Sequence, residues 1–350
     1  MRNIVFYMAI IAISIVTSCR NNSILRGVRV DLMSPDKISV LEEDSLFDCR
    51  FDEILDCQNI QIVSDTILIV QDYTSEDNIF HFKAYSTLSL DYLGEFISNG
   101  RGPEEMIRPH VIKSNSSDNL LCLSDNSTST CGFFDIKSSD DIRKDLVLNR
   151  INVPDNVLDW IPATDSSLFS MSLNSDKLHF LLSDMCGNEI TTYQLYNDAN
   201  GQVVVPKISC LFTNNTQSGK VAAAMLSLPQ IYILNTSDGK VKSVAVNSQY
   251  RNWKNIVTEM FGPETIEYYS GIASDDDYIY AVYSGASIME VNSGEFVPSL
   301  HVLDWDGNFL YELRLEDSIS NLAVDSHSKM LYCLRKSDHS ILRYDLSRLE

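Results

Sequence analysis

The sequence predicts an all-β chain folded as a six-bladed β-propeller with four-stranded antiparallel blades. Helical periodicity is nearly absent after the first 18 residues, and short alternating apolar runs bounded by Ser, Asp, Asn and Gly dominate instead. A polar turn followed by an apolar strand also recurs six times, with the strands beginning at Ile67, Leu120, Leu168, Val221, Ile279 and Leu331. A spacing of about 50 residues between such units is typical of propeller blades and would not arise from a pair of β-sandwiches.

Each repeat has room for four strands. An innermost strand precedes the turn, as at 60–64 and 208–213, and a third strand follows, as at 130–136. Five repeats also hold a fourth strand, but the sixth reaches the end of the chain one strand short. We expect an alternating stretch near the N-terminus, 28–32 or 37–41, to complete this last blade, because closing the ring removes an exposed edge.

The first residues resemble an export signal. Arg2 is followed by an apolar run from Ile4 to Val16, which is short for a membrane span and typical of a signal peptide. Small residues then precede Cys19, as in the lipobox of bacterial lipoproteins, where the cysteine is acylated. The resulting expectation is a signal peptide at 1–18, a lipid anchor and tether at 19–26 and the propeller at 27–350. An uncleaved transmembrane helix is the alternative.

The net charge of the chain indicates which class of partner it does not bind. The 350 residues include 48 Asp and Glu against 27 Lys and Arg, a formal net charge of -21. Such an excess repels phosphate backbones, so nucleic acid is not expected as a partner. No acidic run follows Cys19, which favours an anchor in the outer membrane with the propeller facing the periplasm rather than the cell surface.

Seven cysteines remain after Cys19. Cys122 and Cys333 lie inside apolar strand-like runs, where we expect small buried hydrophobes. An oxidising compartment would also permit a Cys49–Cys57 or a Cys122–Cys131 bridge, and the sequence leaves the pairing open.

Three segments resemble a known family. Residues 92–96 (YLGEF) followed by 99–105 (NGRGPEE) resemble the GxGPxE segment of the TolB-like six-bladed propeller lipoproteins of Gram-negative bacteria, and 278–285 and 302–308 are also similar. With the lipobox, the resemblance covers nearly the whole chain. It implies the fold and the lipid anchor but no reaction, because propellers host unrelated activities. Met106 departs from the family pattern, in which an aromatic residue commonly follows the acid.

Three long insertions fall on one face of the predicted ring, at 100–109, 248–268 and 284–298. Loops elaborated on one side of a rigid scaffold are typical of a binding surface. The second insertion is expected to hold a helix that either binds a partner or packs over the propeller mouth. Apolar residues recur at helical spacing along this segment and would form one face of the helix: Trp253, Ile256, Val257, Met260 and Phe261.

The candidate ligand-binding residues lie on or near this face: Arg101, Glu104, Tyr73, Trp253 and Tyr283. Arg101 could present its planar guanidinium to a carboxylate or sulfate, or it could bind loop carbonyls and Glu104 to hold the turn. The tyrosines could stack on sugar rings, although tyrosines in β proteins also cover strands.

Catalytic patterns are sparse. The six histidines show no metal-ligand spacing, and nucleophile-elbow, phosphate-loop and zinc-protease motifs are absent from the sequence. Asp159 and Asp325 are the acids that we can place on innermost strands. The sequence therefore favours a non-catalytic binding or scaffold module for a protein, peptide or glycan, with no cofactor. The alternative is a propeller-type hydrolase, lactonase or lyase with a metal in the central channel.

Overall fold

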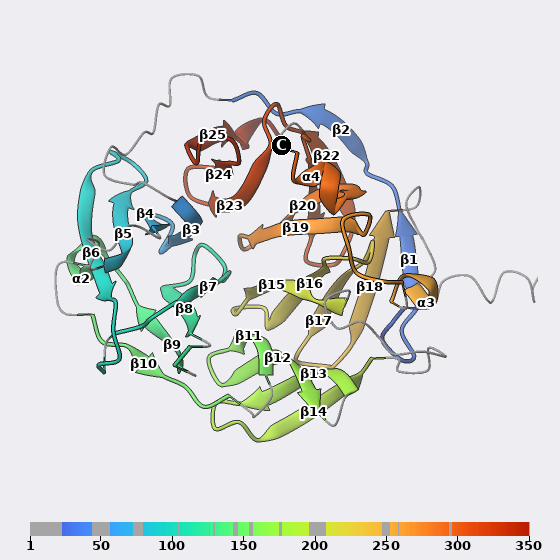
Figure 1. The fold of residues 1–350 in the computed structure, drawn as a ribbon, viewed down its shortest axis with the longest axis horizontal. Coiled ribbons are helices and arrows are strands. Elements are labelled where there is room, and N and C mark those ends of the chain that lie inside the picture. Colours follow the sequence, from blue (N-terminus) through green and yellow to red (C-terminus); the bar gives the residue numbers. More distant parts are fainter. Residues whose placement is uncertain are drawn as a thin grey trace, which may run out of the picture.

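Six sheets are arranged radially around a central axis in the computed structural model, and the chain visits them in sequence order (Figure 1). The structure describes residues 23–43, 57–72, 80–103, 105–125, 127–128, 130–142, 146–153, 157–174, 177–195, 208–246, 253–257, 259–293 and 296–349. Within these residues, no helix is long and apolar enough to span a bilayer. The predicted six-bladed propeller is confirmed.

The first three blades each have four antiparallel strands. Blade 1 is β3 (Cys57–Val63), β4 (Ile67–Asp72), β5 (Phe80–Ser86) and β6 (Tyr92–Ser98). Blade 2 is β7 (His110–Ile112), β8 (Leu120–Asp125), β9 (Thr130–Asp135) and β10 (Asn149–Arg150). Blade 3 is β11 (Val157–Thr164), β12 (Ser167–Asn174), β13 (Lys177–Asp184) and β14 (Glu189–Gln194).

The last three blades differ in strand number. Blade 4 is β15 (Cys210–Asn215), β16 (Lys220–Met225), β17 (Ile231–Asn235) and β18 (Val241–Val246), with β1 (Val30–Met33) added outside. Blade 5 is β19 (Ile266–Ser274), β20 (Tyr278–Ser287), β21 (Ser299–Asp304) and β22 (Phe309–Arg314), with β2 (Lys37–Val40) added outside. Blade 6 is β23 (Ile319–Asp325), β24 (Met330–Arg335) and β25 (Ile341–Asp345). Short helices occupy the connections: α2 (Ser139–Ile142), α3 (Trp253–Ile256), α4 (Ile288–Val291) and η3 (Ser347–Leu349).

The predicted strand beginnings agree with β4, β8, β12, β16, β20 and β24 to within one residue. The polar turns before them are tight hairpins in five blades, whereas in blade 2 the connection from β7 to β8 is longer. In blade 1, Ser64 and Asp65 have φ values of 52° and 54°, the left-handed conformation that a type I′ turn requires at both central positions. Each turn sets the register of its two strands, so the apolar side chains of each strand reach the neighbouring blades.

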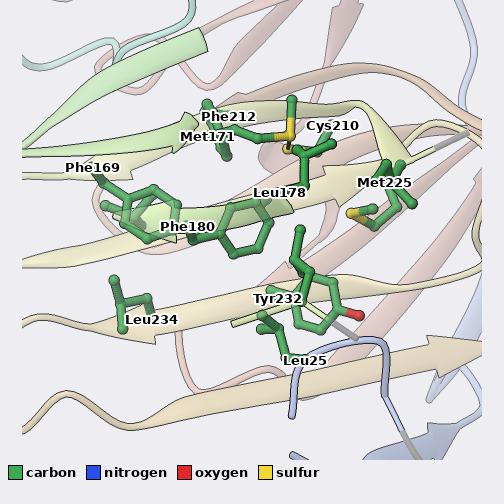
Figure 2. Close-up of a cluster of buried hydrophobic side chains, with 14 of the residues drawn as sticks. Leu25, Phe169, Met171, Leu178, Phe180, Cys210, Phe212, Met225, Tyr232 and Leu234 are labelled. Atoms are coloured by element: carbon green, nitrogen blue, oxygen red, sulfur yellow. Dashed lines mark hydrogen bonds between the residues drawn. The ribbon is translucent and has the colours of Figure 1, made fainter. Parts of the chain in front are cut away.

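The core lies between blades. Buried apolar clusters fill the successive interfaces, and the interface between blades 3 and 4 includes the rings of Phe169, Phe180 and Phe212 (Figure 2). The ring closes where blade 6 packs on blade 1. There a mainly aliphatic cluster joins the two sheets, and the Tyr332 hydroxyl donates a 3.3 Å hydrogen bond to the carbonyl of Thr87.

Residues 23–43 form a belt on the outside of the ring, and Figure 1 shows its strands β1 and β2 in blue along the outer rim. Leu25 bridges to Leu195 of blade 3, β1 pairs in parallel with β18, and β2 pairs in parallel with β22. The belt then reaches blade 6, where Glu43 forms an antiparallel bridge with Tyr344.

The N-terminal segment therefore does contact the last blade, as closure requires, but it does so at Glu43. The two stretches expected to complete that blade form β1 and β2 on blades 4 and 5 instead. The physical reason is that the fourth strand of each of these blades has an unpaired backbone edge, and a parallel strand can also form hydrogen bonds with that edge.

Six cysteines lie in the described residues, and all are free thiols, so the Cys122–Cys131 bridge is not formed. Cys122 and Cys333 are fully buried, as predicted for small hydrophobes, and burial raises their thiol pKa. Cys49 lies outside the described residues.

Candidate functional site

The two faces of the ring differ. On one face, which we call the turn face, the innermost strands end in tight hairpins. On the other, the elaborated face, the chain enters each new blade and connects its second and third strands. Two insertions meet on the elaborated face, because the amides of Ile288 and Met289 in α4 donate 2.9 Å hydrogen bonds to the carbonyls of Thr265 and Pro263.

The loop 99–109 on the elaborated face is built around Glu105. Its carboxylate accepts a 2.7 Å hydrogen bond from the amide of Gly102. A Cβ on Gly100 would collide with the same carboxylate, and one on Gly102 would lie 3.0 Å from it. The glycines of the GxGPxE segment therefore allow the acid to fold into its own loop. Met106, which replaces the expected aromatic residue, is fully buried in the cluster between blades 1 and 2.

Blades 1 and 2 fix this loop by its backbone. The side-chain amide of Gln71 donates a 2.6 Å hydrogen bond to the carbonyl of Pro109. The Asp125 carboxylate accepts hydrogen bonds from the backbone amides of Ile107 and Arg108 at 2.6 and 3.2 Å. His81 Nε2 lies 2.9 Å from the carbonyl of Met106, and burial lowers the pKa of this imidazole, so the neutral ring donates. The loop is thus held rigidly before any ligand is present.

Arg101 lies at the exposed tip of this loop. No hydrogen bond or ion pair of its guanidinium is found within the described part of the chain. Glu104 and Tyr73 lie outside the described residues, so the contact expected between Arg101 and Glu104 remains a prediction.

Trp253 and Tyr283 are placed differently from the rim positions suggested by the sequence. Trp253 begins α3 and is 1% exposed within the cluster between blades 3 and 4. Tyr283 is 9% exposed between blades 4 and 5. The exposed surface of the insertion at 248–268 is instead formed by Met260, which is 89% exposed, and Phe261, which is 47% exposed.

A buried histidine beside Tyr283 was not singled out by the sequence. His301 stacks on Tyr283 with ring centroids 4.2 Å apart, and its Nδ1 lies 3.4 Å from the Tyr269 hydroxyl. Burial lowers the pKa of His301 to about 3, so the ring is neutral at physiological pH. An imidazole surrounded by aromatic rings and away from the central channel stabilises the core and is poorly placed for catalysis.

Lys113 connects three blades from the end of β7. Its Nζ donates to the Asn321 side chain at 2.7 Å, to the carbonyl of Leu322 at 3.1 Å and to the carbonyl of Ile60. No carboxylate lies within ion-pair distance among the described residues, and burial lowers the pKa of the amine to about 7. All three donors of the ammonium are therefore used to join the inner edges of blades 1, 2 and 6.

The turn at 114–119, which we call the closing turn, shuts the channel at the turn face. Asn115 bonds to two blades besides its own: its backbone amide donates to Asn214 Oδ1 of blade 4 at 2.8 Å, and its side-chain amide donates to Asp276 of blade 5 at 3.0 Å. The amide of Ser116 reaches the carbonyl of Ser274 at 3.2 Å. A hairpin from blade 2 thus extends across the ring axis to the opposite blade.

Asp118 in the closing turn lies among other acids. Burial, together with the charges of the nearby Asp276, Asp165 and Asp65, raises the pKa of its carboxyl to about 6. Its Oδ1 accepts a 2.8 Å hydrogen bond from Thr216.

The two acids considered for a channel metal do not share a site. Asp159 lies near the start of β11 at the elaborated face, whereas Asp325 ends β23 at the turn face. Burial raises the pKa of Asp159 to about 7, and Asp325 accepts a 2.9 Å hydrogen bond from the amide of Ser328. Among the described residues, no group of three or more His, Cys, Asp or Glu side chains is placed to hold a metal ion.

Comparison with known proteins agrees with this architecture. A crystal structure of a DUF4221 family member from Bacteroides vulgatus is similar at a TM-score of 0.53 and 10% identity, over 85% of this chain and 94% of that chain. A Bacteroides fragilis protein whose name classes it as exported is similar at a TM-score of 0.51 and 12% identity, over 93% and 97% of the two chains. At such identities the likeness shows the fold alone.

No curated protein matches the sequence. The model of the TolB-like 6-blade propeller-like family matches residues 59–327, which is more than half of the chain. The chain therefore belongs to the TolB-like 6-blade propeller-like family.

Proposed function

We propose that this protein is an exported lipoprotein, acylated at Cys19 and attached to the outer membrane on its periplasmic side. The proposal rests on the apolar N-terminal run and the lipobox-like residues before Cys19. The proposed function of the protein is to bind a protein, peptide or glycan through the elaborated face, without catalysis.

The closed channel is the observation that supports this function best. Because the closing turn blocks the turn face, a ligand can approach the centre of the ring from the elaborated face alone. Lys113, at the inner edge of the ring, is also engaged in structural contacts through its three hydrogen bonds. A rigid loop with Arg101 exposed at its tip then offers a planar donor to an anionic group of the partner.

Photo-crosslinking in intact cell envelopes tests the binding role. A photoreactive residue at Arg101 is expected to give a discrete crosslinked product, whereas the same residue at the exposed Ser237, on the turn face, gives none. Equal products at the two positions, or none at either, would reject the elaborated face as the binding surface. Fatty-acid labelling that is lost in Cys19→Ala tests the anchor separately.

A further inference from the structure

The lipid tether, which rests on the proposed function, is much shorter than the sequence suggested. Ser23, Ile24 and Leu25 are already buried, and the Ser23 hydroxyl donates a 2.9 Å hydrogen bond to the Tyr232 hydroxyl of blade 4. Figure 2 shows Leu25 beside Tyr232 in the same cluster. Ser23 is four residues along the chain from Cys19, and four fully extended steps span only about 14 Å.

The fixed point of this tether lies at the elaborated face. Tyr232 follows the connection between β16 and β17, which opens on that face, and Leu25 bridges Leu195 at the end of β14. The cluster that holds Ile24 and Leu25 also holds Trp253 of α3, and Figure 1 shows α3 next to β1. A bilayer that receives the acyl chains must therefore come close to the blade 4 side of the elaborated face.

The side chains around this point fit a phospholipid surface. Met260 and Phe261 follow α3 and are exposed, and Met289 of α4, whose amide bonds to Pro263, is 56% exposed. Of the exposed large apolar side chains in the described residues, more than half lie on blade 5 or on the insertions that lead into it: Ile38, Val40, Met260, Phe261, Met289 and Val297. Apolar side chains of this kind insert at the boundary between headgroups and acyl chains.

Basic side chains beside the tether are suited to anionic headgroups, while Glu259 and Glu264 are exposed on the loop after α3. Arg26, Arg29 and Lys254 are exposed near the tether, and the sequence contains no acid between Arg20 and Val30. The whole chain carries a net charge of -21, so most of its surface is repelled by anionic lipid. Basic residues close to a membrane surface are attracted to it, and the attraction adds to that of the acyl anchor.

We infer that the blade 4 and blade 5 edge of the elaborated face docks on the phospholipid bilayer, with Met260 and Phe261 inserted and Arg26, Arg29 and Lys254 at the headgroups. Arg101 belongs to the connection between blades 1 and 2, across the ring from this edge. The membrane contact therefore leaves the Arg101 loop open to a partner.

An environment-sensitive fluorophore tests this orientation. It is attached to Met260→Cys in a Cys186→Ser background, because Cys186 is an exposed free thiol, and the matched control is Ser237→Cys on the turn face. The lipidated protein is placed in vesicles of phosphatidylethanolamine and phosphatidylglycerol. We expect the fluorescence at 260 to rise severalfold and to be quenched by nitroxide-labelled lipid, with no change at 237. Reversing charge with Arg29→Glu and Lys254→Glu should reduce the response at 260.

The outcomes separate the two proposals. If Cys19 is not acylated in the envelope, the lipoprotein function fails. If the protein is acylated but the probe at 260 stays as exposed to water as the probe at 237, the docking inference alone fails. Protection at 260 in whole envelopes without protection in vesicles would also overturn it, because a protein partner would then cover this edge.

Discussion

Replacement of His301 by Phe should remove a defined part of the acid sensitivity of this propeller. His301 is buried and its pKa is lowered to about 3 from 6.5, so the unfolded chain takes up the proton first as the pH falls. The stability that the neutral ring provides is present above pH 6.5 and is lost as the pH falls toward 3. At about pH 5 the loss is about 2 kcal/mol, and its limit below the folded pKa is about 5 kcal/mol.

The assay is denaturant unfolding of the wild-type protein and His301→Phe at about pH 7.5 and about pH 5. The difference in unfolding free energy between the two proteins is measured at each pH, and the two differences are compared. Phenylalanine keeps a ring between Tyr283 and Phe309, so the packing cost is common to both pH values. The raised pKa values of Asp159 and Asp118 act in the opposite direction, but they are present in both proteins and cancel. The difference should shift by about 2 kcal/mol in favour of the variant at the lower pH.

A difference between the two proteins that stays constant with pH would refute the reasoning, because it would mean that His301 is protonated as easily in the folded chain as in the unfolded one. The control is Leu313→Ala, which weakens the packing between blades 5 and 6 without removing a titratable group. Its difference from the wild-type protein in unfolding free energy should not vary between the two pH values.

Three further substitutions test the belt, the loop and the closing turn. Leu25→Ala should lower the unfolding free energy by about 2 to 5 kcal/mol, since the side chain is 2% exposed, and a loss below about 0.5 kcal/mol would show that the belt is not part of the core. Gly100→Ala should displace the Glu105 carboxylate at a cost of about 1 to 3 kcal/mol and reduce crosslinking at the tip of the loop; unchanged crosslinking would contradict a preorganised site. Asn115→Ala should cost about 1 to 3 kcal/mol in denaturant unfolding, because the buried Asn115 side chain both donates to Asp276 and accepts from the amide of Ser117, and wild-type stability would argue against closure of the channel.

The blades could be predicted because their determinants are local. Alternating apolar residues define each strand, and a polar turn defines where the next begins, so β4 and β24 were placed within one residue of the observed positions. The belt could not be placed in the same way. β2 is exposed or half-buried at every position, and no pattern of buried side chains specifies which blade it joins. Its position is set by backbone pairing with whichever blade edge the chain reaches first.

The candidate site shows a similar division. The sequence correctly identified an apolar periodicity at 253–261, but the helix ends at Ile256 and only the first part of the segment is buried. The spacing of Trp253 and Met260 is the same whether a side chain meets the core or a partner, so burial could not be deduced. His301 was missed because a histidine in a strand gives no local indication that the adjacent blade will surround it with aromatic rings.

The closing turn and the belt together determine how this propeller can be approached. The closing turn removes access from the turn face, because Asn115 and Ser116 bond to blades on the far side of the axis. The belt begins at Ser23, beside blade 4 on the elaborated face, so the proposed acyl tether at Cys19 would bring the membrane to one edge of that same face. In the proposed orientation a partner can then approach from the opposite side of the ring, over blades 1 and 2, where the backbone of the Arg101 loop is already fixed by Gln71 and Asp125. A rigid loop favours binding at such a surface, because it loses less conformational entropy than a mobile loop when it meets its partner.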